Sequence, residues 1–145
     1  MEERTVYFDN SSTTKPFGKV INEVFEVMDK IYGNPSSLHK MGIESEKILK
    51  RSREIVSTAL QINPEQLIFT SGGTESNNLA IKGAAKSRIK KGNHIVSSVI
   101  EHKSVLESLQ TIENEGFEVT RVPVNQQGRV DLNKLGEAIR KDTIL

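Results

Sequence analysis

The chain has 145 residues, of which 35% are hydrophobic and 27% charged, and its formal net charge is +1. These are ordinary values for a soluble globular protein, and a near-neutral charge gives no basis for binding nucleic acid or an anionic membrane. No apolar run approaches the roughly 18 residues of a membrane span, and the charged N-terminus is unlike a secretory signal. We therefore expect a cytoplasmic protein.

Metal and thiol chemistry are not expected within these residues. The sequence contains no cysteine, which excludes disulfides, thiolate metal sites and a cysteine nucleophile. Its histidines, His39, His94 and His102, are not spaced as a helical ligand pair, so we expect no metal site.

The first part of the chain is predicted to be an arm followed by two helices. A short strand over residues 5–8 leads into a polar loop over residues 9–16. Apolar residues at helical spacing predict a helix that Gly33-Asn34-Pro35 ends: Val20, Val24, Val27, Met28 and Ile31. A second helix is predicted over residues 37–60, with Ser36 or Ser37 as its cap. Its predicted inner stripe consists of Ile48, Leu49, Ser52, Ile55, Val56, Ala59 and Leu60.

From residue 63 onward the pattern alternates between strands and helices. Strands are predicted over residues 66–70, 94–99 and 117–123, with a further strand beginning at residues 143–145. Helices are predicted over residues 74–90, 103–115 and 131–140, the last capped by Asp131. This alternation is typical of a mostly parallel α/β sheet, so we divide the chain into N-terminal arm and helices (residues 1–62) and an α/β domain (residues 63–145).

The predicted sheet looks incomplete. A parallel sheet buries its central strands on both faces, and the chain ends on the first residues of a strand. We therefore expect these residues to be part of a longer protein.

The segment over residues 67–79 has the composition of a phosphate-binding turn. An apolar strand runs into Gly72-Gly73, and Thr74 opens a helix. The first turn of a helix offers unpaired N–H groups and a positive dipole end, and glycines allow close approach of a ligand. The P-loop and dinucleotide fingerprints are absent. The residues alone leave open a tight turn that binds nothing.

A second candidate is His102, which follows the next predicted strand and opens the next helix. The carboxyl ends of parallel strands share one edge of the sheet, so His102 is predicted on the same edge as Gly73 and Thr74. A histidine there could stack on an aromatic cofactor or move protons. Considered alone, the pattern favours a capping or surface histidine.

Taken in order, four stretches resemble the NifS/IscS-type cysteine desulfurases, in the class V aminotransferase group of fold-type I pyridoxal-phosphate (PLP) enzymes. They read YFDNSSTT, YGNPSSLH, FTSGGTESNN and IEHKSVLE, with Ser11-Ser12 as a departure where the family more often has small apolar residues. The resemblance implies a three-layer α/β/α domain, a homodimer and PLP as cofactor. It implies that Gly73 and Thr74 bind the phosphate and that His102 stacks over the pyridine ring and assists proton transfer.

The implied reaction converts L-cysteine to L-alanine and passes the sulfur on as an enzyme persulfide for iron–sulfur cluster or thio-cofactor assembly. The partners implied are a sulfur-acceptor or scaffold protein. The family's Schiff-base lysine, pyridine-pairing aspartate, substrate-binding arginine and sulfur-accepting cysteine belong to motifs not found in these residues. We therefore expect the 145 residues alone to be inactive and to retain PLP weakly or not at all.

Three alternatives stay open from the sequence. The chain could be a truncated, non-catalytic binding or dimerisation module, because it lacks the lysine and cysteine machinery. It could belong to another class V enzyme, such as a selenocysteine lyase. It could also be a nucleotide-binding α/β protein that uses the Gly72-Gly73 turn for a different phosphate.

Overall fold

The computed structural model describes residues 6–145, and the chain divides into two compact units, Met1–Ile68 and Phe69–Leu145. We call them unit 1 and unit 2 and describe each by itself. The division between the units falls between Ile68 and Phe69. The boundary predicted between residues 62 and 63, which separates the N-terminal arm and helices from the α/β domain, remains a prediction. No helix in the described part of the chain is long and apolar enough to cross a membrane.

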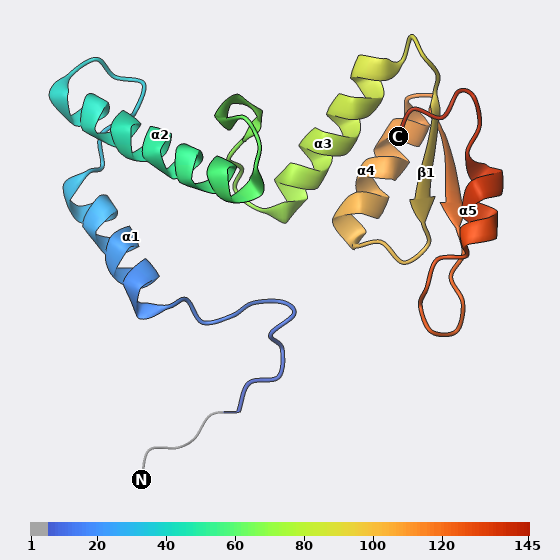
Figure 1. The fold of residues 1–145 in the computed structure, drawn as a ribbon, viewed down its shortest axis with the longest axis horizontal. Coiled ribbons are helices and arrows are strands. Elements are labelled where there is room, and N and C mark those ends of the chain that lie inside the picture. The colour runs from blue at the N-terminus through green and yellow to red at the C-terminus, as the bar shows by residue number, and fades with distance from the viewer. Residues whose placement is uncertain (1–5) are drawn as a thin grey trace. The chain divides into compact units, whose positions relative to one another are not determined.

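Unit 1 contains two helices and a short 3-10 turn. The helices are α1 (Gly18–Lys30) and α2 (Lys40–Leu60), and the turn is η1 (Pro64–Gln66) (Figure 1). Both predicted helices are confirmed, but the predicted cap of α2 is wrong. His39 caps the helix instead, because its Nδ1 accepts the Gly42 N–H at 3.3 Å.

Neither of the first two predicted strands is present among the described residues. Thr5 lies outside the described residues, and residues 6–8 pair with no strand. The strand predicted over residues 66–70 is also wrong: η1, closed by a capping box on Asn63, precedes it, and the following residues join no ladder. Leu67 is extended, but an extended segment becomes a strand only when a neighbour supplies ladder hydrogen bonds.

The predicted inner stripe of α2 is largely exposed. Ile55 and Leu60 keep 60% and 59% of their surface in solvent, and only Ile48 and Ser52 of the stripe are half-buried. The helical spacing was identified correctly, but amphipathic spacing specifies a face without specifying what covers it. Little of the described chain packs on this stripe.

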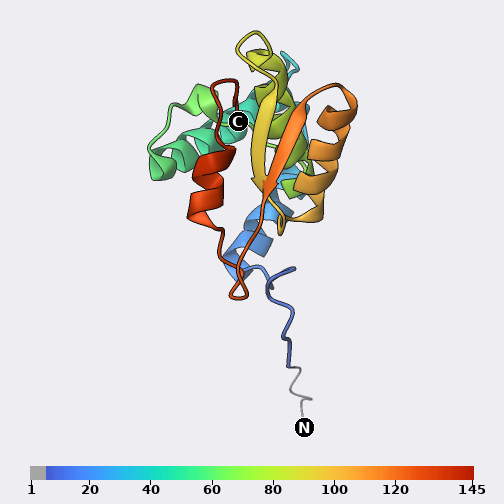
Figure 2. The same ribbon diagram turned by 90° about the vertical axis from the view of Figure 1, so that its right-hand side faces the viewer.

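Unit 2 is the α/β part that the alternating pattern predicted. Its elements in chain order are α3 (Gly73–Arg88), β1 (His94–Ser98), α4 (Lys103–Asn114), β2 (Glu118–Val122) and α5 (Leu132–Ala138). β1 and β2 are parallel and in register from His94 opposite Glu118 to Ser98 opposite Val122. Helices α3 and α4 lie on one side of these strands and α5 on the other, so the α/β/α layering is confirmed (Figures 1 and 2).

The core of unit 2 lies between the strands and the α3–α4 layer. Its buried apolar side chains are Ala85, Ile95, Leu109, Ile112, Phe117 and Ile144. Ile81, Val105 and Val119 pack against them from the edge. Ile112 has no exposed surface. Each helix therefore contributes an apolar stripe to one continuous core, which fixes α3 and α4 mainly through their carboxyl-terminal halves.

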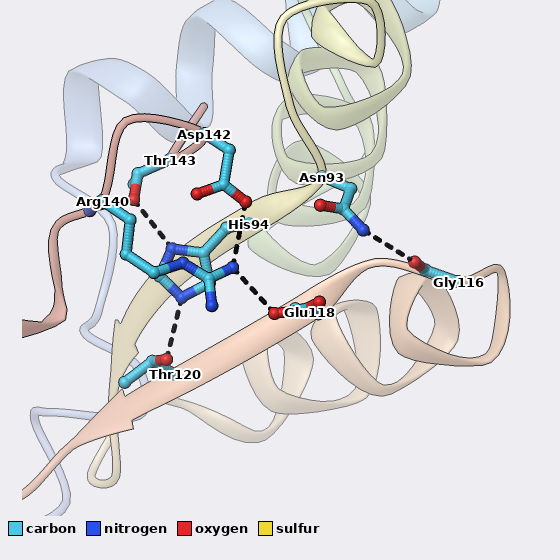
Figure 3. A network of polar contacts seen from close by, with 8 residues as sticks. All are labelled: Asn93, His94, Gly116, Glu118, Thr120, Arg140, Asp142 and Thr143. Carbon is cyan, nitrogen blue, oxygen red and sulfur yellow. Dashed lines mark hydrogen bonds and ion pairs between the residues drawn. The ribbon is translucent and has the colours of Figure 1, made fainter.

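A buried histidine ties three neighbouring segments of the sheet together at the amino end of β1. The His94 ring has no exposed surface, and its Nδ1 and Nε2 lie 2.7 and 2.8 Å from the hydroxyls of Thr143 and Thr120 (Figure 3). Thr143 forms a parallel bridge to His94 on the side away from β2, which agrees with the strand predicted to begin there. Both ring nitrogens are thus paired.

Next to this network Gly92 allows the chain to pass closely. A Cβ on Gly92 would overlap the backbone of Asp142. Asp142 O in turn accepts the His94 N–H, and Ile144 N–H donates to His94 O. The missing side chain therefore lets residues 142–145 pair with β1.

Glu113 and Arg121 of unit 2 form a bidentate ion pair. Arg121 Nη1 and Nη2 donate hydrogen bonds to Glu113 Oε1 and Oε2 at 2.8 and 2.7 Å. The guanidinium holds the pKa of the Glu113 carboxyl below its usual value of 4.5. Glu113→Gln should lower the free energy of unfolding at neutral pH by about 0.5–1 kcal/mol. Because the folded pKa is depressed, the wild type loses this contribution as the pH falls below 4.5.

The difference between Glu113→Gln and wild type should therefore shrink in acid. Urea denaturation of both proteins, followed by circular dichroism at neutral and acid pH, measures it. A difference that stays constant across that range would contradict the pairing as its cause.

Candidate phosphate and histidine site

The turn before α3 is held by its own side chains. The Ser71 N–H and hydroxyl both donate to the Glu75 carboxylate, at 2.6 and 2.7 Å, and the Thr70 and Ser76 hydroxyls lie 2.6 Å apart. The bonds from Ser71, its backbone N–H first, hold the pKa of the Glu75 carboxyl below its usual range. Glu75 is therefore a carboxylate at neutral pH, and its charge is already engaged by Ser71.

The first turn of α3 presents unpaired donors. Gly72 is the N-cap and offers no side chain to the helix, and the first N–H with an acceptor is that of Ser76, which bonds to Gly72 O at 3.0 Å. Among the described residues, the N–H groups of Gly73, Thr74 and Glu75 have no acceptor. A Cβ on Gly73 would meet nothing within 4 Å, so a ligand can approach the turn. Unpaired N–H groups at a helix start favour an anion, above all a phosphate.

His102 is the N-cap of α4, as the capping interpretation predicted. Its Nδ1 accepts the Ser104 N–H at 3.1 Å and lies 2.8 Å from the Ser104 hydroxyl. Among the described residues Nε2 has no partner, and the side chain is exposed. Nδ1 therefore caps the helix, whereas Nε2 is not used by the cap.

Thr74 and His102 border one hollow, although they are distant in sequence. It has a volume of about 290 Å³ and is lined by Thr74, Asn78, His102, Lys103, Ser104 and Glu107. Gly73 does not line the hollow but supplies an N–H beside Thr74. The geometry thus brings two of the predicted site residues to one place at the carboxyl end of β1, where open α/β sheets bind ligands.

The contact between Asn77 and Ser104 next to His102 was not predicted. Asn77 Nδ2 donates to Ser104 Oγ at 2.8 Å, and Ser104 is only 7% exposed. A capping side chain typically accepts the backbone N–H two residues further on. This spacing could have identified the contact between His102 and Ser104 from the sequence. Nothing in the sequence pairs Asn77 with Ser104, because their contact depends on how α3 packs against α4.

Another hollow, of about 610 Å³, lies in unit 1, lined by Lys50, Arg53, Glu54, Asn63, Pro64, Glu65 and Leu67. It contains none of the predicted site residues and no set of unpaired backbone donors that the structure identifies. In the described part of the chain, no three His, Asp or Glu side chains gather so as to hold a metal ion. The hollow beside Thr74 is therefore the better candidate despite its smaller volume.

Parallel strands, helices on both sides and a helix start whose N–H groups have no acceptor define an α/β protein with a candidate anion site. Residues 6–145 match the family described as aminotransferase class-V. The chain belongs to this family.

Known relatives narrow the resemblance. The chain is 49% identical over 140 residues to a NifS/IcsS protein homolog of Lactobacillus delbrueckii subsp. bulgaricus, covering 97% of the chain and 36% of that protein. It is 46% identical over 147 residues to the cysteine desulfurase IscS of Dictyoglomus turgidum, covering 99% and 36%.

A solved structure of a NifS-like protein superimposes with a TM-score of 0.90 at 39% identity, covering 95% of the chain and 38% of that protein. The predicted NifS/IscS-type resemblance and fold are thereby confirmed. The chain spans 36% of the length of these two curated relatives.

Proposed function

We propose that the chain is the N-terminal portion of a PLP-dependent cysteine desulfurase. In this proposal it supplies the phosphate-binding turn and the histidine that lies against the pyridine ring of the cofactor. The unpaired N–H groups of Gly73 and Thr74 carry this proposal. They occur in a chain of the class-V aminotransferase family, 46% identical to a protein named cysteine desulfurase. The activity proposed is conversion of L-cysteine to L-alanine with transfer of sulfur to a persulfide.

The residues fit a phosphorylated aromatic cofactor. The Gly73 and Thr74 N–H groups and the Thr74 hydroxyl can donate to a phosphate, and the helix dipole favours its charge. His102 borders the same hollow as Thr74, so its ring can lie against a ring whose phosphate sits on Thr74. PLP, when bound, supplies an electron sink for the substrate.

His102 is the proposed proton-transfer residue of this chain. Ser104 contacts Nδ1 and so holds the ring at the start of α4, while Nε2 has no partner among the described residues. Because a backbone N–H can only donate, the neutral ring carries its proton on Nε2, and His102 is proposed to present this proton to the ligand without reorientation of the ring.

The remaining parts of the proposal concern the whole protein. The sulfur-accepting cysteine must come from outside these residues, because they contain none. We propose a cytoplasmic homodimer that passes sulfur to an acceptor or scaffold protein for iron–sulfur cluster or thio-cofactor assembly. The 145 residues alone are expected to be inactive, since the resemblance assigns the Schiff-base lysine to a motif that they lack.

Thr74→Ala in the full-length protein should weaken PLP retention without loss of the fold. The substitution removes one hydroxyl donor to a charged group, worth about 1.5–3 kcal/mol, or about a ten- to hundredfold rise in Kd. Fluorescence or absorbance titration of the apoprotein with PLP measures the change, and Thr74→Ser, which keeps the hydroxyl, is the control. An unchanged Kd in Thr74→Ala would contradict a phosphate at this turn.

A further inference from the structure

The His102 ring is engaged by a chain of hydrogen bonds that begins on α3. Asn77 Nδ2 lies 2.8 Å from Ser104 Oγ, and Ser104 Oγ lies 2.8 Å from His102 Nδ1. The Ser104 N–H adds a second contact to the same nitrogen, at 3.1 Å. A residue of α3 is therefore linked to the ring through a residue of α4.

In this series of hydrogen bonds each group donates toward His102 Nδ1. A backbone N–H can only donate, so Nδ1 accepts from Ser104 N–H, and in the neutral ring the proton is on Nε2. The Asn77 amide presents Nδ2 to Ser104 Oγ, so Asn77 donates to this hydroxyl. The Ser104 hydroxyl hydrogen is then left to donate to Nδ1, because that nitrogen has a lone pair and no proton.

The burial of Ser104 and Asn77 favours this direction of hydrogen bonding, from Asn77 through Ser104 to His102. Ser104 is only 7% exposed, and Asn77 is half-buried. Water therefore competes weakly for the hydroxyl, and a buried polar group without its partner is unfavourable. His39 caps α2 through Nδ1 and the Gly42 N–H, and no side chain in the described part of the chain contacts its Nδ1.

We infer that Asn77 and Ser104 are positioning residues that fix His102 as its Nε2–H tautomer, with the protonated nitrogen directed to the hollow beside Thr74. Helix capping needs only the Ser104 N–H, so the Asn77–Ser104 contact serves the ring and not the helix. The contact also couples α3, which carries the phosphate turn, to the histidine on α4. This inference rests on the proposed function for its consequence in catalysis, but not for the tautomer itself.

Nitrogen-15 NMR of the full-length protein, labelled at histidine, tests the tautomer without any activity. His102→Asn assigns the His102 signals by their loss. The wild-type ring should show an unprotonated Nδ1 and a protonated Nε2. Ser104→Ala removes one of the two donors, so the preference for this tautomer should fall about three- to tenfold.

Asn77→Asp is the sharper variant. A carboxylate at residue 77 accepts the Ser104 hydroxyl proton and turns an oxygen lone pair toward Nδ1, so it should also shift the ring toward Nδ1–H. Ser108→Ala removes another buried hydroxyl of α4, which donates to Ser104 O at 2.7 Å. It should leave the tautomer ratio of His102 unchanged. The His39 signals should stay the same in every variant. A wild-type ring protonated at Nδ1, or a ratio that neither Ser104→Ala nor Asn77→Asp changes, would overturn the inference.

Measurements of kcat distinguish failure of this inference from failure of the proposed function. In the full-length protein Ser104→Ala should lower kcat about three- to tenfold at unchanged PLP content. If His102→Asn lowers kcat but Ser104→Ala does not, the positioning role is wrong and the proposed function stands. If His102→Asn retains full activity, the catalytic role of His102 is wrong, whatever the tautomer.

Discussion

Replacing His102 by alanine in the full-length protein is expected to lower turnover of L-cysteine by about 10²–10⁴-fold, the range typical of a positioned acid–base group. PLP content should fall far less, because the proposed phosphate donors, Gly73 and Thr74, lie on a different helix. Alanine production from L-cysteine gives the turnover, and the absorbance of the bound cofactor gives its content.

Alanine at residue 102 also removes the cap of α4, which typically lowers stability by about 1 kcal/mol. His102→Asn separates the two effects, since asparagine is a strong N-cap residue but has no imidazole. We expect His102→Asn to recover stability and not turnover. Full activity in His102→Asn would remove the ring from the mechanism.

Ile112→Ala should have the largest effect on stability, lowering the free energy of unfolding by about 2–5 kcal/mol. Ile112 has no exposed surface and lies in the core that joins α4 to the strands. The loss combines the buried methylenes with the cavity they leave.

Ile139→Ala is the matched control for this prediction. It makes the same chemical change in the same unit at a side chain that is 59% exposed, and its effect should stay within about 0.5 kcal/mol. Urea denaturation of the two variants and the wild type measures the difference. Equal losses in the two variants would show that Ile112 does not lie in a packed core.

The order of elements in unit 2 was predictable because each carries its own signal. α3, β1, α4 and β2 follow residue patterns with clear periods, and Asp131 caps α5 as predicted, accepting the N–H groups of Asn133 and Lys134. Local signals failed where structure depends on distant partners. The segment 67–70 joins no ladder although its residues favour a strand, and the apolar stripe of α2 is left largely exposed.

The candidate site shows the same division. Gly73 and Thr74 could be proposed from a glycine turn followed by a helix, and His102 from its place after a strand, since all these are local features. The Asn77–Ser104 contact could not be predicted, because its residues are 27 positions apart and meet only when α3 packs on α4. The prediction that Ser36 or Ser37 caps α2 failed because residues 33–39 form a longer turn, in which Asn34 Oδ1 accepts the Ser36 N–H.

The most direct test of the central claim is the yield of L-alanine from L-cysteine by the full-length protein, measured with and without PLP in wild type and Thr74→Ala. The account predicts PLP-dependent alanine formation in the wild type, and a PLP requirement shifted to higher concentration in Thr74→Ala but not in Thr74→Ser. Absence of alanine from PLP-saturated wild type, or a PLP requirement that Thr74→Ala leaves unchanged, would contradict it.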